Sequence, residues 1–313
     1  MRIKFLCAAL LWLWLPIAMA QGCPSTGVQV QVLGSGGPEL ADKRASSSYL
    51  VWLDGKPRVL VDIGGGAALR FGEAGATVSD LDVILLTHLH VDHAGDLPAL
   101  VKMSFFENRE QPLPIYGPAG NKLMPSTVTF VRSLFDSTRG TFRYLGNFLS
   151  PLAKDTYKLQ PHDVSEPRGK IGAPRKTGDK LRYAFANENL RAIAVSVTHG
   201  PLPALAWRVE AGGKNIVFSG DTNGEGGLAQ LADGADLLIA HSAVAEDANA
   251  GERTLHMPPS VIGRIARAAK VKQLVLSHRM RRTLGHEAET LGAIKKFYQG
   301  PTSFANDLDC FQP

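Results

Sequence analysis

Short apolar runs separated by polar turns extend along most of the chain, and this pattern predicts a protein rich in β-strands. Val28 to Leu33 alternates glutamine with aliphatic residues and predicts a half-buried strand that ends at a glycine-rich turn. Ser48 to Leu53 and Arg58 to Asp62 predict the next two strands. Asp54-Gly55 between them is a strong hairpin signal, so we expect these two strands to pair.

Each of five later apolar runs is followed by a histidine or an aspartate. They are Val83 to Thr87 before His88, Ala192 to Thr198 before His199, Asn215 to Phe218 before Asp221, Leu237 to Ile239 before His241, and Leu274 to Ser277 before His278. Side chains at the same ends of neighbouring strands lie close together in space. These five positions therefore predict one cluster rather than five separate loop residues.

The stretch from about Gly120 to Arg182 breaks this pattern. It contains one expected helix, Ser126 to Phe135, and then a long polar and basic stretch from His162 to Lys180. Compact domains rarely contain structureless loops of this length unless the loops are functional. Two interpretations remain open, a solvated surface insertion and an arm that covers the substrate.

The first twenty residues have the pattern of a signal peptide. Arg2 and Lys4 form a positive start, and an unbroken apolar run follows from Phe5 to Leu15. Ala18-Met19-Ala20 then supplies small residues at the spacing that a signal peptidase reads. The run is too short to span a bilayer as a helix, which takes ~20 residues. We therefore expect an exported protein, periplasmic or secreted, whose mature chain begins after residue 20.

Two cysteines remain in the mature chain, Cys23 and Cys310. In an oxidising compartment a disulfide between them would join the two ends of the chain. Two unpaired thiols are the alternative, because the sequence does not supply the separation of the Cα atoms. Cys23 could instead carry a lipid anchor, although Ala20-Gln21-Gly22 lacks the larger aliphatic residue that is usual three places ahead. No later stretch is apolar over 18 residues, so the mature chain is not expected to span a membrane.

Composition narrows the class of protein. The chain has 313 residues, of which 44% are hydrophobic and 20% charged, which is enough for a large core and argues against disorder. The net charge of +5 is too small to indicate a nucleic-acid binder, and we expect nucleic acid not to be a partner. Neither glycine run has the spacing of a dinucleotide-binding loop, and the chain has no phosphate-loop or Gly-x-Ser-x-Gly motif.

The strongest chemical signal is His88-Leu89-His90-Val91-Asp92-His93, which places four metal-binding side chains within six residues. Imidazole and carboxylate together suit zinc, iron or manganese. In an extended segment His88 and His90 point the same way, and a turn after them would bring Asp92 and His93 to a second position. A purely structural cluster would need hydrogen-bond partners for four polar groups beside a buried run. The motif therefore predicts a metal site.

These residues resemble the metallo-β-lactamase superfamily over nearly all of the mature chain. His88-x-His90-x-Asp92-His93 matches the hallmark motif of that family, and the later matches fall in the family's order. They are His199 in Val197-Thr198-His199, Asp221 in Ser219-Gly220-Asp221-Thr222, His278 in Leu276-Ser277-His278, and Asp62, the family's structural aspartate, in Val61-Asp62-Ile63-Gly64. The resemblance implies an α/β fold, a four-layer αβ/βα sandwich with the metals at one edge between two sheets. Residues 21–313 would form one domain with a polar, basic insertion at about 120–182.

Carried over to this chain, the resemblance implies two zinc ions per chain, with manganese or iron as alternatives. The implied ligands are His88, His90 and His199 for the first ion, Asp92, His93 and His278 for the second, and Asp221 as the bridge between them. Two ions ~3.5–4 Å apart share a water, lower its pKa and polarise the bond to be broken. No nucleophile from the protein is then needed.

Two further segments, Leu33 to Pro38 and Ile115 to Pro118, resemble the branch of the family that contains transfer-RNA 3′ endonucleases and arylsulfatase-like or phosphodiesterase-like enzymes. His256, ahead of a helix expected near Pro258, is similar to that branch's catalytic histidine, which contacts the phosphate and assists the leaving group. Arg282 matches an arginine of the branch. The alternatives are a helix-start residue for His256 and a solvated charge run for Arg282.

One position departs from that branch. In the transfer-RNA nucleases a His-Glu-Ala-Thr stretch follows the strand that Leu237 to Ile239 forms here, and its glutamate orients the catalytic histidine. Ala240-His241-Ser242-Ala243 stands at this place, so His241 takes the glutamate position. This difference and the expected export both argue against cleavage of transfer RNA. We expect His241 and Arg282 to bind the substrate.

Together these observations predict an exported binuclear zinc hydrolase in which Asp92 and His256 act in catalysis. The expected substrate is a small anionic ester, either a phosphodiester or a sulfate ester, cleaved by metal-bound hydroxide while His256 protonates the leaving oxygen. A lactone or β-lactam hydrolase with the same site is one alternative. A non-catalytic metal-binding scaffold is another, and the complete set of seven ligands argues against it.

Overall fold

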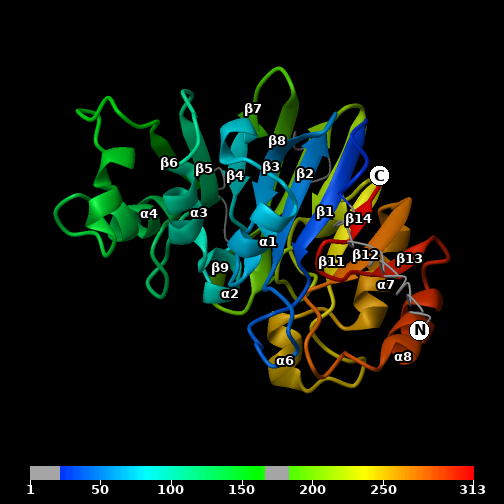
Figure 1. Ribbon diagram of the computed structural model, residues 1–313. Coiled ribbons are helices and arrows are strands. Elements are labelled where there is room, and N and C mark those ends of the chain that lie inside the picture. Colours follow the sequence, from blue (N-terminus) through cyan, green and yellow to red (C-terminus); the bar gives the residue numbers. More distant parts are fainter. Residues whose placement is uncertain (1–21, 166–182) are drawn as a thin grey trace, which may run out of the picture.

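The computed structural model describes residues 22–165 and 183–313 (Figure 1). Within these ranges the strands form two mixed sheets of seven strands each. The predicted signal peptide lies outside the described residues, and so does the expected basic stretch from residue 166 onward. No helix of the described ranges has the length and apolar character needed to cross a membrane.

The first sheet contains the strands that precede the gap and the last strand of the chain, in the order β14-β1-β2-β3-β4-β5-β6. Its strands are β1 (Val28–Gly34), β2 (Ser48–Leu53), β3 (Lys56–Val61), β4 (Val83–Leu85), β5 (Leu113–Pro118), β6 (Leu159–Val164) and β14 (Cys310–Phe311). β2 and β3 form the antiparallel hairpin that Asp54-Gly55 predicts. From β3 to β6 the neighbouring strands are parallel.

The second sheet has the order β13-β12-β11-β10-β9-β8-β7. Its strands are β7 (Tyr183–Ala186), β8 (Leu190–His199), β9 (Leu202–Ala211), β10 (Lys214–Phe218), β11 (Leu237–His241), β12 (Gln273–Ser277) and β13 (Thr302–Phe304). β7 to β10 pair antiparallel with their neighbours, whereas β10 to β13 are parallel.

The helices lie outside the two sheets, and most of them cover the outer face of a sheet (Figure 1). They are α1 (Ala67–Glu73), α2 (Val91–Ala94), α3 (Leu97–Ser104), α4 (Thr127–Phe135), α5 (Leu228–Leu231), α6 (Ala250–Leu255), α7 (Pro259–Ala268) and α8 (Glu287–Lys295), with short 3-10 helices at Val78–Asp80 and Arg143–Phe148. α4 is the helix expected from the sequence, and the side chain of Ser126 caps it by accepting a hydrogen bond from Thr129 N at 3.2 Å.

Among the described residues, three apolar clusters make up the core. One packs α1, α3 and α4 on the first sheet, and another packs α5 and α7 on the second. The third lies between the sheets, where valines of β1 and β2 meet Trp207, Val209 and Phe218 of β9 and β10. The layers therefore run helix, sheet, sheet, helix, which confirms the predicted sandwich.

The first strand differs from its prediction, because β1 is buried on both faces. Gln29 and Gln31 are almost completely buried although their polarity suggested an exposed face. Gln31 Oε1 accepts a hydrogen bond from Trp52 Nε1 at 3.1 Å, which satisfies the buried amide. Residues far along the chain close this side of the strand, since β14 pairs with β1.

Cys23 and Cys310 form a disulfide, with their Cα atoms 5.6 Å apart. Of the possibilities that the sequence leaves open for Cys23, the structure thus has the disulfide. Cys310 lies in β14, opposite Gln31 of β1, so the bond and the strand pairing hold the two ends of the described chain together. A bond between residues 287 positions apart restricts the unfolded chain strongly.

Replacing Cys310 by serine should lower the free energy of unfolding by about 2–5 kcal/mol, because the unfolded chain regains the freedom that the disulfide removes. Urea unfolding of the oxidised wild type and of Cys310→Ser measures the difference. A reductant should destabilise the wild type by a similar amount and leave the variant unchanged. Equal midpoints for the variant and the oxidised wild type would contradict this role.

Candidate metal centre

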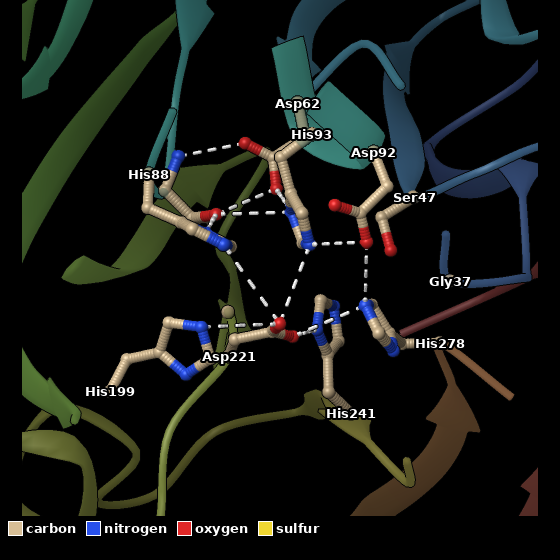
Figure 2. Close-up of polar contacts among 12 residues, drawn as sticks. Gly37, Ser47, Asp62, His88, Asp92, His93, His199, Asp221, His241 and His278 are labelled. Carbon is tan, nitrogen blue, oxygen red and sulfur yellow. Dashed lines mark hydrogen bonds and ion pairs between the residues drawn. The ribbon is translucent and has the colours of Figure 1, made fainter. Parts of the chain in front are cut away.

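Five strand ends bring polar side chains to one edge of the sandwich (Figure 2). β10, β11 and β12 run parallel, and β8 has the same direction because β9 is antiparallel to both β8 and β10. Their carboxyl ends therefore meet at one edge, where β4 of the first sheet also ends. The residues gathered there are those that follow the five apolar runs, and all are buried: His88, His199, Asp221, His241 and His278.

One group of four side chains offers ligand atoms that lie within 4.8 Å of one another, and it consists of His88, His90, His199 and Asp221. His88 follows β4, His90 directly precedes α2, and His199 is the last residue of β8. Asp221 Oδ2 lies 3.9 Å from Nε2 of His88 and 3.7 Å from Nε2 of His199. The structure thus brings together the three ligands implied for the first ion and the implied bridge.

A second group shares Asp221 and adds His93, His241 and His278. Nε2 of His93 lies 3.7 Å from Asp221 Oδ2, and Nε2 of His278 lies 3.4 Å from Asp221 Oδ1. Asp92, which was expected in this group, stands beside it. Its Oδ2 is 3.3 Å from His278 Nε2 and 3.6 Å from His93 Nε2 (Figure 2). His241 therefore occupies a place among the ligand atoms that the resemblance had not assigned to it.

Three histidine Nε2 atoms that face Asp221 lack a hydrogen-bond partner in the part of the chain that the structure describes. They are the buried Nε2 atoms of His88, His93 and His199. Buried polar atoms without partners are costly, and distances of 3.7 to 3.9 Å from Asp221 Oδ2 are too long for hydrogen bonds. Two ligands of one tetrahedral zinc ion, each bonded at ~2.1 Å, lie roughly 3.4 Å apart. The donor set and its spacing therefore fit metal ions.

Asp62 fixes the orientation of His93. Its Oδ2 lies 2.7 Å from His93 Nδ1 and accepts a hydrogen bond from Thr87 Oγ1, also at 2.7 Å. A carboxylate on one ring nitrogen directs the other nitrogen toward a metal, a common arrangement around metal-binding histidines. Asp62 and His278 have backbone φ angles of 57° and 52°. Residues other than glycine seldom adopt this left-handed region, and those that do cluster at functional sites.

Burial and neighbouring charges set the ionisation of the centre. Burial alone would raise the pKa of Asp221, but the surrounding histidines hold that pKa well below its ordinary value. Burial lowers the pKa of His88 and lowers that of His241 to about 3, so both rings are neutral at pH 7. Burial also opposes protonation of His93, but the carboxylates of Asp221 and Asp62 outweigh it and raise the pKa. Asp221, His88 and His241 are therefore already in the protonation state in which such groups bind a metal, whereas His93 would release a proton on binding.

His241 is held at both ring nitrogens. Nδ1 lies 2.7 Å from Asp221 Oδ1, and Nε2 lies 2.9 Å from the hydroxyl of Tyr49, which also bonds Ser277 Oγ at 3.0 Å. The expectation that His241 contacts the substrate is therefore corrected, since the ring is buried and both nitrogens face protein groups of the centre. Tyr49 was missed because it lies on β2, 192 residues from His241 in sequence, and no motif marks it.

Replacing Tyr49 by phenylalanine should weaken zinc binding by about 10–100-fold, the usual effect of losing a group that orients a metal ligand. The change removes only the hydroxyl, so His241 loses the partner that fixes its ring. Tyr157→Phe is the matched control, because its buried hydroxyl bonds Ser104 Oγ at 2.7 Å in the core under α3. Competition with a chelator measures each affinity, and equal affinities for the two variants would show that Tyr49 does not position His241.

His256 adjoins the cluster without belonging to either group of four. It lies between α6 and α7, and its Nδ1 is 4.0 Å from Asp221 Oδ2. That nitrogen is buried and has no hydrogen-bond partner among the described residues. Burial lowers the pKa of His256 to about 4. The structure therefore places His256 within reach of a group bound next to Asp221, and its catalytic role stays a prediction.

Arg282 lies close to His256 but is paired within the protein. Its Nε donates to Ala243 O at 2.6 Å, and one terminal nitrogen donates to Glu252 Oε1 at 2.5 Å. Glu252 belongs to the capping box at the start of α6, so this pair ties Arg282 to that helix. The positive charge of Arg282 contributes to the low pKa of His256. A direct contact of Arg282 with substrate stays a prediction.

The chain is similar to a known protein superfamily, to several ribonucleases and to solved structures. A sequence model of the metallo-beta-lactamase superfamily matches residues 41–264. The ribonuclease Z of Methanosarcina acetivorans is 29% identical over 80% of this chain and 87% of its own length. The ribonuclease Z of Mycolicibacterium paratuberculosis is 30% identical over 70% of this chain and 71% of its own length. The short form of human tRNase Z superposes with a TM-score of 0.68 at 21% identity, covering 91% of this chain and 98% of that protein.

These relatives overturn one expectation from the sequence. Nucleic acid had been set aside as a partner on the grounds of the modest net charge, the expected export and the departure at His241. The similar proteins are ribonucleases by name, and they share 29–30% of their residues with this chain over most of its length. The expectation against a nucleic-acid substrate is therefore wrong. Net charge of the whole chain was a poor guide, because it carries no information about the site itself.

Proposed function

The chain belongs to the metallo-beta-lactamase superfamily and is a metal-dependent hydrolase of that group, and we propose that it cleaves phosphodiester bonds with two zinc ions held on Asp221. The observation that carries the proposal is the set of unpartnered Nε2 atoms of three buried histidines around one ionised aspartate. Nitrogen and carboxylate ligands of this kind suit zinc. The ribonuclease relatives support a phosphodiester as the substrate.

The protein residues have distinct tasks in this proposal. Zinc ions, when bound, would supply an activated water and neutralise charge on the phosphate. One ion would be held by His88, His90 and His199. Asp221 belongs to both groups of ligands and would help to hold both ions. His93 and His278 would hold the other, with Asp92 and His241 close enough to complete its shell. His256, outside both groups of four, would pass a proton to the leaving oxygen.

A panel of substrates tests the proposal on the purified protein with zinc restored. It contains bis-nitrophenyl phosphate, a precursor transfer RNA, an aryl sulfate, a lactone and a cephalosporin. We expect hydrolysis of one or both phosphodiesters, with loss of the activity in a chelator and recovery on return of zinc. Cleavage of the sulfate, the lactone or the cephalosporin without cleavage of either phosphodiester would refute the proposal, as would activity that survives the chelator.

We also propose that the protein is exported and that its mature chain begins near residue 21. The charged, apolar and small-residue pattern of residues 1–20 supports export, and the Cys23–Cys310 disulfide supports an oxidising compartment. Mass spectrometry of the native protein should show a chain that starts at Gln21 with the disulfide intact. An unprocessed Met1 terminus in the cytoplasm would overturn the proposal. A lipid on Cys23 would keep export and change only the anchoring, at the expense of the disulfide.

A further inference from the structure

A cleft of about 420 Å³ opens beside the metal centre. Thr198 and Gly200, the chain neighbours of His199, both line it, so the cleft adjoins a metal ligand. Its walls come from the turn between β8 and β9, the loop after β5 and the end of β6. The side chain of Asn121 joins two of these walls through a hydrogen bond from Nδ2 to Pro201 O at 2.8 Å.

The cleft continues the apolar space between the two sheets. Pro118 and Val164 stand opposite each other in the register of β5 and β6, and both line the cleft. Leu205 of β9 also lines it and belongs, with Val164, to the cluster between the sheets. The cleft is thus the unfilled end of that core, open at the edge where the metal ligands lie.

The part of the lining that the structure describes is also without charge. None of the described residues that line the cleft is a lysine, arginine, aspartate, glutamate or histidine. Asn121, its most polar residue, has its amide engaged, because Oδ1 accepts from the backbone N–H groups of Leu123 and Met124 while Nδ2 donates to Pro201. An ionised group in the cleft would lose its water and meet no opposite charge among the described residues, whereas an apolar ring would need no polar partner. The volume falls in the range of ~300–1,000 Å³ that small-molecule sites occupy.

We propose that this cleft is a substrate subsite that receives an uncharged ring, aryl group or nucleobase, attached to the ester bound at the metal centre. The inference rests on the proposed function, because it needs an anionic ester held next to His199. Burial of the ring against Pro118, Val164 and Leu205 supplies binding energy that a methyl group at the same place does not. The metal centre thus sets the reaction, and the cleft selects esters by the size and neutrality of one substituent.

Binding of three phosphonates to the zinc-loaded protein, measured by calorimetry, tests the subsite without any turnover. Phenylphosphonate should bind about tenfold or more tightly than methylphosphonate, because only the phenyl ring reaches the apolar walls. 2-Aminoethylphosphonate, which carries a charge, should gain nothing over methylphosphonate. Equal affinities for the phenyl and methyl compounds would overturn the subsite. A nucleoside 5′-phosphonate, measured in the same way, shows whether the cleft accepts a nucleobase as well as a simple aryl group.

A carboxylate introduced at Ala119, which lines the cleft, should reverse this preference. Ala119→Asp should abolish the advantage of the phenyl compound and tighten binding of 2-aminoethylphosphonate by about two- to fivefold, the size of a partly exposed ion pair. Misfolding cannot produce this gain in affinity for 2-aminoethylphosphonate, because a misfolded variant would bind the phosphonates more weakly. Ala153→Asp places the same carboxylate on a half-buried loop residue outside the cleft and should behave like wild type.

An unchanged preference in Ala119→Asp would overturn the subsite and leave the proposed function intact. Failure of all the phosphonates to bind, together with no hydrolysis of either phosphodiester in the substrate panel, would overturn the proposed function and this inference with it.

Discussion

Asp221→Ala should lose bound metal and at least about 10³-fold of the hydrolytic activity. The loss should exceed the ~10²–10³-fold cost of removing one oxyanion-stabilising group, because Asp221 belongs to both groups of candidate ligands. Its carboxylate is also the negative charge around which the buried histidines are arranged. Elemental analysis and a rate assay on the same preparation measure the two losses together.

Asp236→Ala is the matched control for that variant. Asp236 is also buried, but it pairs with Lys272 at 2.8 Å at the start of β11, away from the metal centre. We expect this variant to be less stable and to keep its metal and its activity per folded molecule. Metal content near the wild-type value in Asp221→Ala would contradict the assignment of Asp221 as the bridge.

His256→Ala should keep its zinc and lose activity according to the leaving group. Proton donation by a positioned side chain contributes ~10²–10⁴-fold, so kcat should fall by that factor for an alkyl phosphodiester. A nitrophenyl ester leaves without help, and its kcat should fall much less. Burial lowers the pKa of His256 to about 4 in the free protein. An anionic phosphate bound beside the ring would raise that pKa and so favour the protonated ring that donates the proton.

His286→Ala is the control for loss of a histidine that is exposed and faces Glu289. It should match the wild type with both esters. Equal losses of kcat with the alkyl and nitrophenyl esters in His256→Ala would show that His256 orients the substrate instead of donating a proton. Loss of zinc in that variant would show that His256 is a metal ligand.

The centre was largely predictable because its residues follow buried strands. An apolar run that ends in a histidine or aspartate marks a carboxyl end of a strand, and such ends meet at one edge of a sheet. The strand pattern therefore groups His199, Asp221 and His278 at one edge of the second sheet. His88 follows β4 of the first sheet and joins them because the two sheets pack face to face. The position of His241 does not follow from that pattern, because the choice between a ligand and a substrate contact depends on where Asp221 and Tyr49 lie around its ring.

Much of the sheet pairing was beyond the sequence. β14 has only two residues, and β6 carries Pro161 and polar side chains, so neither shows a strand pattern. Both are edge strands whose partners supply the order. The sequence left the disulfide undecided for a related reason, because the separation of Cys23 and Cys310 follows from the pairing of β14 with β1. Local periodicity predicts elements well and their distant partners poorly.

Stepwise return of zinc to chelator-treated protein, followed by hydrolysis of bis-nitrophenyl phosphate, tests the binuclear phosphodiesterase most directly. The metal-free protein should be inactive, and the rate should rise with added zinc and level off at about two equivalents per chain. Full activity without metal, or a plateau at one equivalent, would contradict the account.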